Sequence, residues 1–142
     1  MSKKIKPEDL QKELLNYLDN YKEDIDEEVT EATDTITKEA KEELIKTSPR
    51  DSVARNTKYY KGWAVKIGAR TRKKSYRYTK VIWNKTNYQL THLLEFGHHK
   101  RDGTGWVEAR PHIRDVEQKY GTKFVDLLEQ KIRRVSKWPY KN

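Results

Sequence analysis

A helical pattern of about forty residues at the start of the chain limits the possible fold more than any other feature. From Pro7 to about Ile45, no residue after the proline breaks a helix. Apolar side chains recur there in three groups, each displaced by eleven residues from the one before: Leu10, Leu14, Leu18; Tyr21, Ile25, Val29; Ala32, Ile36, Ala40. An eleven-residue repeat averages about 3.67 residues per turn, so the apolar stripe runs nearly straight along one face. We therefore predict one long helix over residues 7–45.

A helix of this length has consequences for packing. At a rise of about 1.5 Å per residue it measures roughly 58 Å, which exceeds the diameter of a small domain. The helix must therefore overhang its own core or be covered by another subunit. Its opposite face is acidic and is either solvated or in charge contact with a neighbouring subunit; its acidic residues are Glu23, Asp24, Asp26, Glu27, Glu31 and Asp34.

Charge is divided unevenly along the 142 residues, whose net charge is +9. Residues 1–45 hold 7 Lys and no Arg against 14 acidic residues, a net charge of −7. Residues 46–142 therefore carry +16, and within residues 46–86 there are 13 Lys and Arg with Asp51 as the only acid. This asymmetry indicates either a basic face turned toward DNA or an acidic helix lying against a neighbour's basic surface. Both interpretations stay open on charge alone.

The middle of the chain predicts an antiparallel hairpin. Pro49, in "TSPRDS", ends the long helix because proline lacks an amide hydrogen and forces the residue before it out of the helical region. After a loop of about ten residues, "GWAVKIGAR" alternates Trp63, Val65 and Ile67 with small or basic residues, which is typical of a half-buried strand. "TRKK" (71–74) is the predicted turn, and "SYRYTKVIWN" the second strand.

The last third predicts a short helix, a projecting hairpin arm and a final helix. "TNYQLTHLLEFG" has short-helix spacing, and Gly97 is placed to end that helix in a left-handed conformation. "KRDGTG" has turn chemistry centred on Gly103, so the arm projects between "EFGHH" and "WVEAR". Pro111 opens a helix that continues to about residue 135, with a possible kink at Gly121, and 136–142 form a tail.

These elements predict an α+β fold. The long helix (7–45) and the C-terminal helix (111–135) pack on a small antiparallel sheet of about three to four strands, which lies with the short helix and the arm in residues 46–110. The chain length is that of one domain, 1–142.

The histidine-rich stretch "THLLEFGHHKRDGTGWVEARPHIRD" (91–115) invites a catalytic or metal-binding interpretation. Its spacing argues against one. A zinc-protease helix needs two histidines four residues apart with the glutamate beside the first, whereas here Glu95 is three residues after His92 and position 96 is Phe. There is no cysteine in the chain and no phosphate-binding glycine loop or nucleophile elbow. We therefore expect no enzymatic activity, no metal and no cofactor. Apolar runs of only a few residues likewise predict neither a membrane span nor a signal peptide.

The segment "RTRKKSYRYTK" (70–80) interleaves basic and aromatic side chains, as surfaces that meet phosphate backbones do. Tyrosines on one face of a strand are also common in cross-strand packing, so this pattern does not decide between the two. The candidate residues facing DNA are Arg70, Arg72, Lys73, Lys74, Arg77 and Lys80. Sequence-specific readout is not expected, because no helix presents base-reading residues.

Several segments together resemble a known family. They are "TSPRDS" after a long helix, "YYKGWAVK", and "VIWNKTNYQLTHLLEFGHHKRDGTGWVEARPHIRDVE". In this order they are similar to the small neck proteins of long-tailed bacteriophages, called the gene-product-ten-like, tail-completion or minor head–tail joining family. The resemblance is dense over residues 45–118 and extends to the helices by pattern only. Asp51-Ser52 departs from the threonine-glycine that the family often has after the proline.

The resemblance implies a non-enzymatic virion protein, assembled in the host cytoplasm, that joins or completes the tail at the head–tail interface. It implies a homo-oligomeric ring around the DNA channel, with connector or head-completion proteins and tail-tube or tail-terminator proteins as partners. The alternative is a sequence-independent DNA-binding protein that uses residues 70–80. We expect Glu95 to contact Arg110 or a neighbour's basic residue. The candidate subunit-interface or arm residues are Glu95, Gly97, His98, His99, Gly103, Gly105, Trp106, Arg110 and Pro111.

Overall fold

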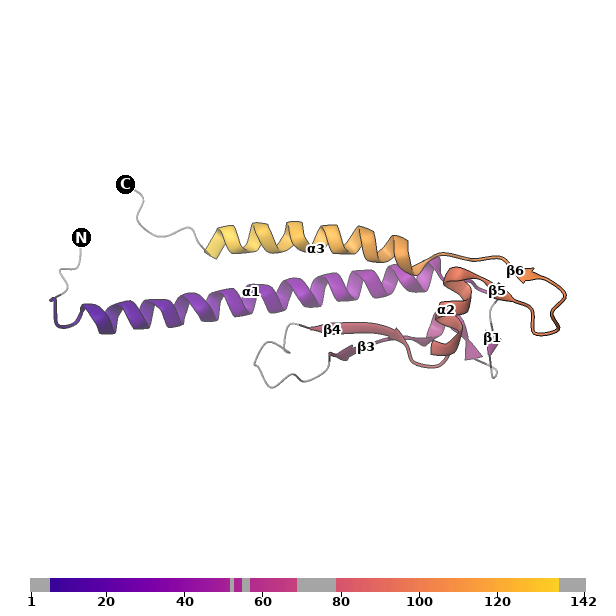
Figure 1. The fold of residues 1–142 in the computed structure, drawn as a ribbon. Coiled ribbons are helices and arrows are strands. Elements are labelled where there is room, and N and C mark those ends of the chain that lie inside the picture. Colours follow the sequence, from indigo (N-terminus) through magenta and orange to yellow (C-terminus); the bar gives the residue numbers. More distant parts are fainter. Residues whose placement is uncertain (1–5, 52, 55–56, 69–78, 136–142) are drawn as a thin grey trace.

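The computed structural model describes residues 6–51, 53–54, 57–68 and 79–135. The molecule is elongated along its N-terminal helix, with the C-terminal helix on one side and a two-stranded sheet on the other (Figure 1). A short helix and a hairpin arm lie at the end where these elements converge. The predicted α+β class, with a long N-terminal helix and a C-terminal helix beside small antiparallel sheets, is confirmed.

The long helix α1 spans Leu10–Thr47, so it begins three residues later and ends two residues later than predicted. Its 38 residues measure about 57 Å. Ser48 follows in an extended conformation, with φ −63° and ψ 142°, as expected for a residue that precedes a proline. The helix is therefore terminated by Pro49, in agreement with the sequence.

The C-terminal helix α3 (Ile113–Val135) packs antiparallel on the second half of α1 (Figure 1). Ion pairs set the register between the two helices: Lys119 with Glu43, Lys123 with Glu39, and Lys131 with both Glu28 and Glu31. The same register places Val135, the last residue of α3, opposite Glu27. Residues 10–26 of α1 therefore extend beyond α3. α3 continues through Gly121 as one helix.

The predicted central hairpin is present as β3 (Trp63–Ile67) and β4 (Lys80–Asn84), paired antiparallel with Trp63 opposite Asn84. The predicted turn 71–74, and the parts of the two predicted strands that adjoin it (69–70 and 75–78), lie outside the described residues. Of the predicted apolar face only Trp63 is buried, whereas Val65 and Ile67 are exposed. The sheet extends past the core here, so these two side chains have no cover within the described chain.

Two further strand pairs are separate from this hairpin. β1 (Val53–Ala54) pairs with β2 (Thr57–Lys58) in the segment that was predicted to be a loop, and β5 (His98–His99) pairs with β6 (Trp106–Val107) at the base of the arm. The described residues thus form three two-stranded sheets in place of one sheet of three to four strands.

The short helix α2 (Tyr88–Phe96) ends at Gly97, which has φ 75° and ψ 173°. The positive φ was predicted, but the extended ψ sends the chain directly into β5 and not into a left-handed cap. The core lies where α1, α3 and the start of β3 meet, and it is small; its buried hydrophobic residues are Ile36, Ala40, Leu44, Tyr59, Trp63, Val116 and Tyr120. A short 3-10 turn, η1 (Tyr59–Gly62), carries Tyr59 into this core.

Candidate functional site

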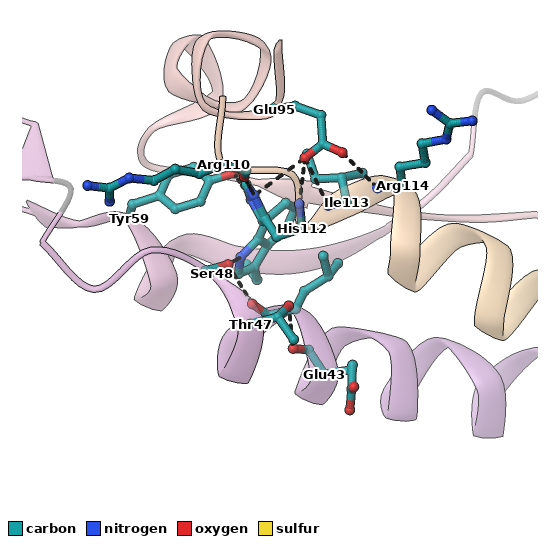
Figure 2. A network of polar contacts seen from close by, with 11 residues as sticks. Glu43, Thr47, Ser48, Tyr59, Glu95, Arg110, His112, Ile113 and Arg114 are labelled. Atoms are coloured by element: carbon teal, nitrogen blue, oxygen red, sulfur yellow. Dashed lines mark hydrogen bonds and ion pairs between the residues drawn. The ribbon is translucent and has the colours of Figure 1, made fainter. Parts of the chain in front are cut away.

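Glu95, at the end of α2, caps the start of α3. Its Oε2 accepts hydrogen bonds from the backbone N–H groups of His112 (2.9 Å) and Ile113 (3.0 Å), and its Oε1 accepts one from Arg114 (2.9 Å) (Figure 2). The first N–H groups of a helix have no partner within the helix, and the helix dipole favours negative charge there. A carboxylate from a different helix thus replaces the local capping residue that α3 lacks.

The environment of Glu95 keeps its carboxylate charged although only 8% of the residue is exposed. Burial by itself raises the pKa of this carboxyl, but the three backbone N–H donors and the nearby His112 outweigh it, and the pKa lies below its ordinary value. The predicted contact between Glu95 and Arg110 is wrong. No local sequence pattern predicts a capping residue that lies 17 positions upstream of His112. The Arg110 side chain binds Asp51 instead.

His112 is the centre of a buried polar column. Its Nδ1 donates to the carbonyl oxygen of Arg110 (2.8 Å), because a carbonyl can only accept, and in the neutral imidazole its Nε2 then accepts from the hydroxyl of Tyr59 (2.9 Å). Burial raises the pKa of Tyr59 well above its ordinary value, which keeps this hydroxyl protonated as the donor. The Trp63 ring packs edge-on against both rings, and its Nε1 donates to Oγ of Ser48 (2.7 Å).

Asn84 connects the end of the central hairpin to this column. Its side-chain nitrogen donates to the backbone carbonyl of Tyr59 (2.8 Å), and its side-chain oxygen accepts from the backbone N–H of Asn87 at the start of α2 (2.8 Å). Gly62 permits this approach, because a Cβ there would lie 2.3 Å from the same oxygen. We call the whole set the junction; its residues are Ser48, Tyr59, Trp63, Asn84, Glu95 and His112. It ties α1, β3, β4, α2 and α3 together at one end of the molecule.

The hairpin arm, residues 98–107, projects from the junction end of the molecule (Figure 1). Its tip is closed by Asp102, whose carboxylate accepts from both the hydroxyl (2.6 Å) and the N–H (3.0 Å) of Thr104, and by Gly103 at φ 72°. Gly97 forms its base, where a Cβ would lie 2.7 Å from the carbonyl oxygen of Val107. The sequence therefore located both the arm and the glycines that shape it.

The side chains of the arm are mostly exposed. His99 and Trp106 pack edge to face, with ring centroids 4.8 Å apart, and Trp106 remains 48% exposed. His98 is half-buried, whereas Gly105 and Pro111 are exposed. Of the predicted interface residues, Glu95 and Gly97 are buried and hold the base of the arm in position, so they are not accessible to a neighbour.

Arg110 leaves the base of the arm toward the loop that follows α1, where its guanidinium binds the Asp51 carboxylate through two nitrogens, one of them at 2.8 Å. Hydrogen bonding to this side chain lowers the pKa of Asp51 to about 2. The backbone N–H of Arg110 also donates to the Leu94 carbonyl (2.6 Å), which anchors the arm to α2. The Asp51–Arg110 pair joins residues 59 positions apart, and no local sequence signal predicts it.

The basic segment predicted to face DNA is described only at its end. Arg70, Arg72, Lys73, Lys74 and Arg77 lie outside the described residues. Lys80 begins β4, and its ammonium is paired with Asp34 of α1. In the described part of the same hairpin, Lys66 lies over the Trp83 ring, 4.3 Å from its centroid.

The free end of α1 presents an exposed apolar surface. Leu10, Leu14, Leu15 and Leu18 are each about half exposed, and Tyr17 stacks with Tyr21 on the same stretch, with centroids 6.3 Å apart.

Among the described residues, no group of three or more His, Asp or Glu side chains could hold a metal ion. The helices of that same part of the chain are also not long and apolar enough to cross a membrane.

A rigid polar junction between two exposed apolar ends is typical of a protein that works by assembling with other chains. The comparisons agree with this class. A family described as "Bacteriophage HK97-gp10, putative tail-component" matches residues 12–97, well over half of the chain. No curated protein and no solved structure gave a significant match.

The chain therefore belongs to the HK97-gp10-like family of bacteriophage tail components. A role in the phage tail is structural and implies a virion protein that contacts other virion proteins. The match covers most of α1, the central hairpin and α2, and it ends before the arm. The resemblance seen in residues 98–118 lies outside the matched range.

Proposed function

We propose that this chain joins or completes the phage tail at the head–tail interface, as a homo-oligomeric ring around the DNA channel. Its partners in the virion would be the connector or head-completion proteins on one side and the tail-tube or tail-terminator proteins on the other. Assembly would take place in the host cytoplasm. The proposal rests on the family and on the distribution of apolar surface.

The observation that carries the proposal is the bare half of α1. A helix that exposes four leucines within nine residues is costly for a soluble monomer, because such a surface orders water and favours association. The opposite end of the molecule exposes a different apolar set: Phe96 at the end of α2, and Trp106 and Val107 of the arm (Figure 1). Two unlike surfaces at opposite ends suit head-to-tail contacts, which close into rings when the rotation allows.

In this proposal the arm is the contact to a neighbouring virion protein. His98, His99 and Trp106 would supply the contact surface, and Gly103 and Gly105 the narrow tip. The direction in which the arm leaves the junction would be fixed by the residues at its base: Glu95, Gly97, Arg110 and Pro111. Trp106 is the strongest single candidate, because exposed tryptophan is enriched among the residues that dominate binding energies.

Electron microscopy of phage made without this protein tests the proposal. We expect DNA-filled heads and separate, complete tails, with joined particles restored when the protein is supplied from a plasmid. A plasmid that carries Trp106→Ala should restore fewer joined particles than one that carries Val125→Ala, a control at an exposed apolar position on the outer part of α3. Joined particles at the normal frequency in the complete absence of the protein would rule out the head–tail role.

A second candidate function is sequence-independent contact with DNA through the central hairpin. Its support is that residues 57–68 and 79–85 hold five lysines and no acidic residue, with Lys66 already seated on an aromatic ring. Backbone binding should weaken log-linearly with salt concentration, and charge reversal at Arg72, Lys73, Lys74 and Arg77 should flatten the slope. Reversal at Arg133 and Arg134, on α3, is the control for reversal at Arg72 and Lys73 alone, because each pair changes the net charge by the same amount. A salt slope near zero for the unaltered protein would exclude this function.

A further inference from the structure

The eleven-residue repeat of α1 places equivalent side chains in opposite environments. Ala32, Ile36 and Ala40 are 0%, 8% and 5% exposed, because α3 and the core cover them. Two repeats earlier on the same stripe, Leu10, Leu14 and Leu18 are 57%, 54% and 49% exposed. The free end of α1 therefore presents the face that is buried in the other half of the helix, but the described chain provides nothing to cover it.

The size of these side chains indicates what kind of surface would cover them. Alanines at positions 32 and 40 let α3 approach α1 closely. Leucines at the equivalent positions of the free end hold a second helix further away and need a hollow to enter. A groove lined by apolar side chains can therefore receive this face.

The molecule carries such a groove on its own surface. A cavity of about 520 Å³ opens between α3 and β4, with the second half of α1 as its floor. Its lining is mainly apolar and includes Ile36, Ala40, Leu44, Ile82, Tyr120 and Phe124. The floor from Ile36 to Leu44 and the leucine face from Leu10 to Leu18 each cover eight residue steps, about 12 Å of helix. The groove and the leucine face are therefore matched in length and in polarity.

Charge favours the same pairing. Residues 8–26 hold 7 acidic and 2 basic side chains, a net charge of −5. Two free ends of α1 side by side would therefore repel each other. The hairpin beside the groove belongs to a segment that holds five lysines and no acid. Of the residues that line the cavity, Lys80, which is paired with Asp34, and Glu117 are charged, so the attraction comes from the hairpin around the groove and not from its lining. An acidic helix end and this basic hairpin attract each other and would fix the orientation of the contact.

We propose that the leucine face of α1 in one copy of this chain docks into the groove between α3 and β4 of the next copy. This deepens the proposed function and rests on its homo-oligomeric assembly. The contact is heterologous, since each copy offers its free end to one neighbour and its groove to the other. Repetition of one such contact generates a closed ring or an open helix, depending on the rotation between neighbours.

Cysteine cross-linking tests this contact without background, because the chain contains no cysteine. Leu10, Leu14 and Leu18 are each replaced by Cys in one set of proteins, and Gly121→Cys is made in another. Gly121 lines the groove, and an added side chain there meets no atom within 4 Å. Within one chain, position 121 lies opposite about residue 41, roughly 40 Å of helix from residue 14, so a link between the two sets joins different chains.

The experiment mixes the two sets at high protein concentration with a short bismaleimide linker. We expect at least one of the three leucine positions to link to position 121 about tenfold more than to Gly105→Cys, a control glycine on the arm that also meets no atom within 4 Å. A chain carrying both Leu14→Cys and Gly121→Cys should give a ladder of bands that ends at the copy number of the ring. In that same double-cysteine chain, Leu10→Glu with Leu18→Glu should abolish the ladder and leave the thermal unfolding midpoint unchanged, since both side chains are exposed.

Three results would overturn the proposal: linking between free ends of α1 only, equal linking to positions 121 and 105, or a strictly monomeric protein with no linked product. The third result would also follow if residues 136–142 of the same chain covered the leucines. Failure here is distinct from failure of the proposed function. If phage lacking the protein give separate heads and tails but no 14–121 link forms, the head–tail role stands and this contact is refuted. If such phage give joined particles but a clear 14–121 link forms, the contact stands and the head–tail role is refuted.

Discussion

Replacement of the cap carboxylate, Glu95→Gln, should destabilise the chain by about 2–4 kcal/mol at neutral pH. The glutamine amide has one acceptor oxygen for the three backbone N–H donors of residues 112–114. Its NH₂ group faces the donors that this oxygen does not reach. A buried N–H left without a partner costs about 1–3 kcal/mol. Loss of negative charge at a helix N-terminus costs a further ~1 kcal/mol in a partly buried setting. Urea unfolding followed by helical circular dichroism measures the difference, and the unfolding midpoint in a thermal scan should fall by roughly 6–15 °C.

The effect of Glu95→Gln should also depend on pH. The pKa of Glu95 is lower in the folded chain than in the unfolded chain, where it is about 4.3. The carboxylate's contribution is therefore fully present above that pH and is lost as the pH falls through the folded pKa. The difference in unfolding free energy between Glu95→Gln and the unaltered protein should be constant from pH 7 to about pH 5 and should narrow below pH 5.

Glu108→Gln, at an exposed position before α3, is the matched control, and its unfolding free energy should lie within about 0.5 kcal/mol of that of the unaltered protein. A Glu95→Gln effect as small as that of the control, or one that is unchanged at pH 3, would refute the capping role.

Three further outcomes are expected. Gly97→Ala should cost at least about 1–3 kcal/mol in urea unfolding, because φ is 75° and the new Cβ would press on the Val107 carbonyl, whereas Gly105→Ala should be near neutral. Tyr59→Phe should cost about 1–3 kcal/mol, because His112 Nε2 then stays buried without a donor; equal stability would mean that water replaces the hydroxyl. In hydrogen exchange, amides of residues 10–26 should exchange far faster than those of the packed half of α1 in the monomer and should slow on assembly, since an isolated helix of this length is marginal in water. Equal protection of both halves in the monomer would show that the chain covers its own leucines.

Periodicity and turn chemistry predicted most of the fold. The eleven-residue stripe located α1 to within three residues at each end, and Pro49, Gly97 and Gly103 marked changes of direction that the structure has. These signals work because they depend on a few neighbouring residues. An alternating pattern records which face of a strand is apolar but not where the core ends, so these signals overestimated how far the core extends along β3. Val65 and Ile67 follow the pattern of Trp63 but lie beyond the core.

The contacts of the junction, and the Asp51–Arg110 pair beside it, were not predictable in the same way. Glu95 with the start of α3, Arg110 with Asp51 and Tyr59 with His112 each join residues 17 to 59 positions apart, and their charges could pair in several ways. One signal was present: "ARPHIRD" begins a helix without Ser, Thr, Asp or Asn before its first turn, so a cap had to come from elsewhere. Such reasoning shows that a partner is needed, but only the fold identifies Glu95 as that partner.

The junction also bears on assembly through the angles that it sets. A ring closes only if each copy meets the next at one fixed rotation, so the groove must keep its shape in every copy. Its two walls, α3 and β4, are not joined to each other by a sheet, and both are oriented by buried polar contacts at one end: α3 by Glu95 and His112, β4 by Asn84. Apolar packing alone tolerates shifts between elements, whereas directional hydrogen bonds with buried donors and acceptors do not. On the proposed contact, a variant such as Glu95→Gln would therefore disturb ring closure at concentrations of denaturant, or at temperatures, where the isolated chain is still folded.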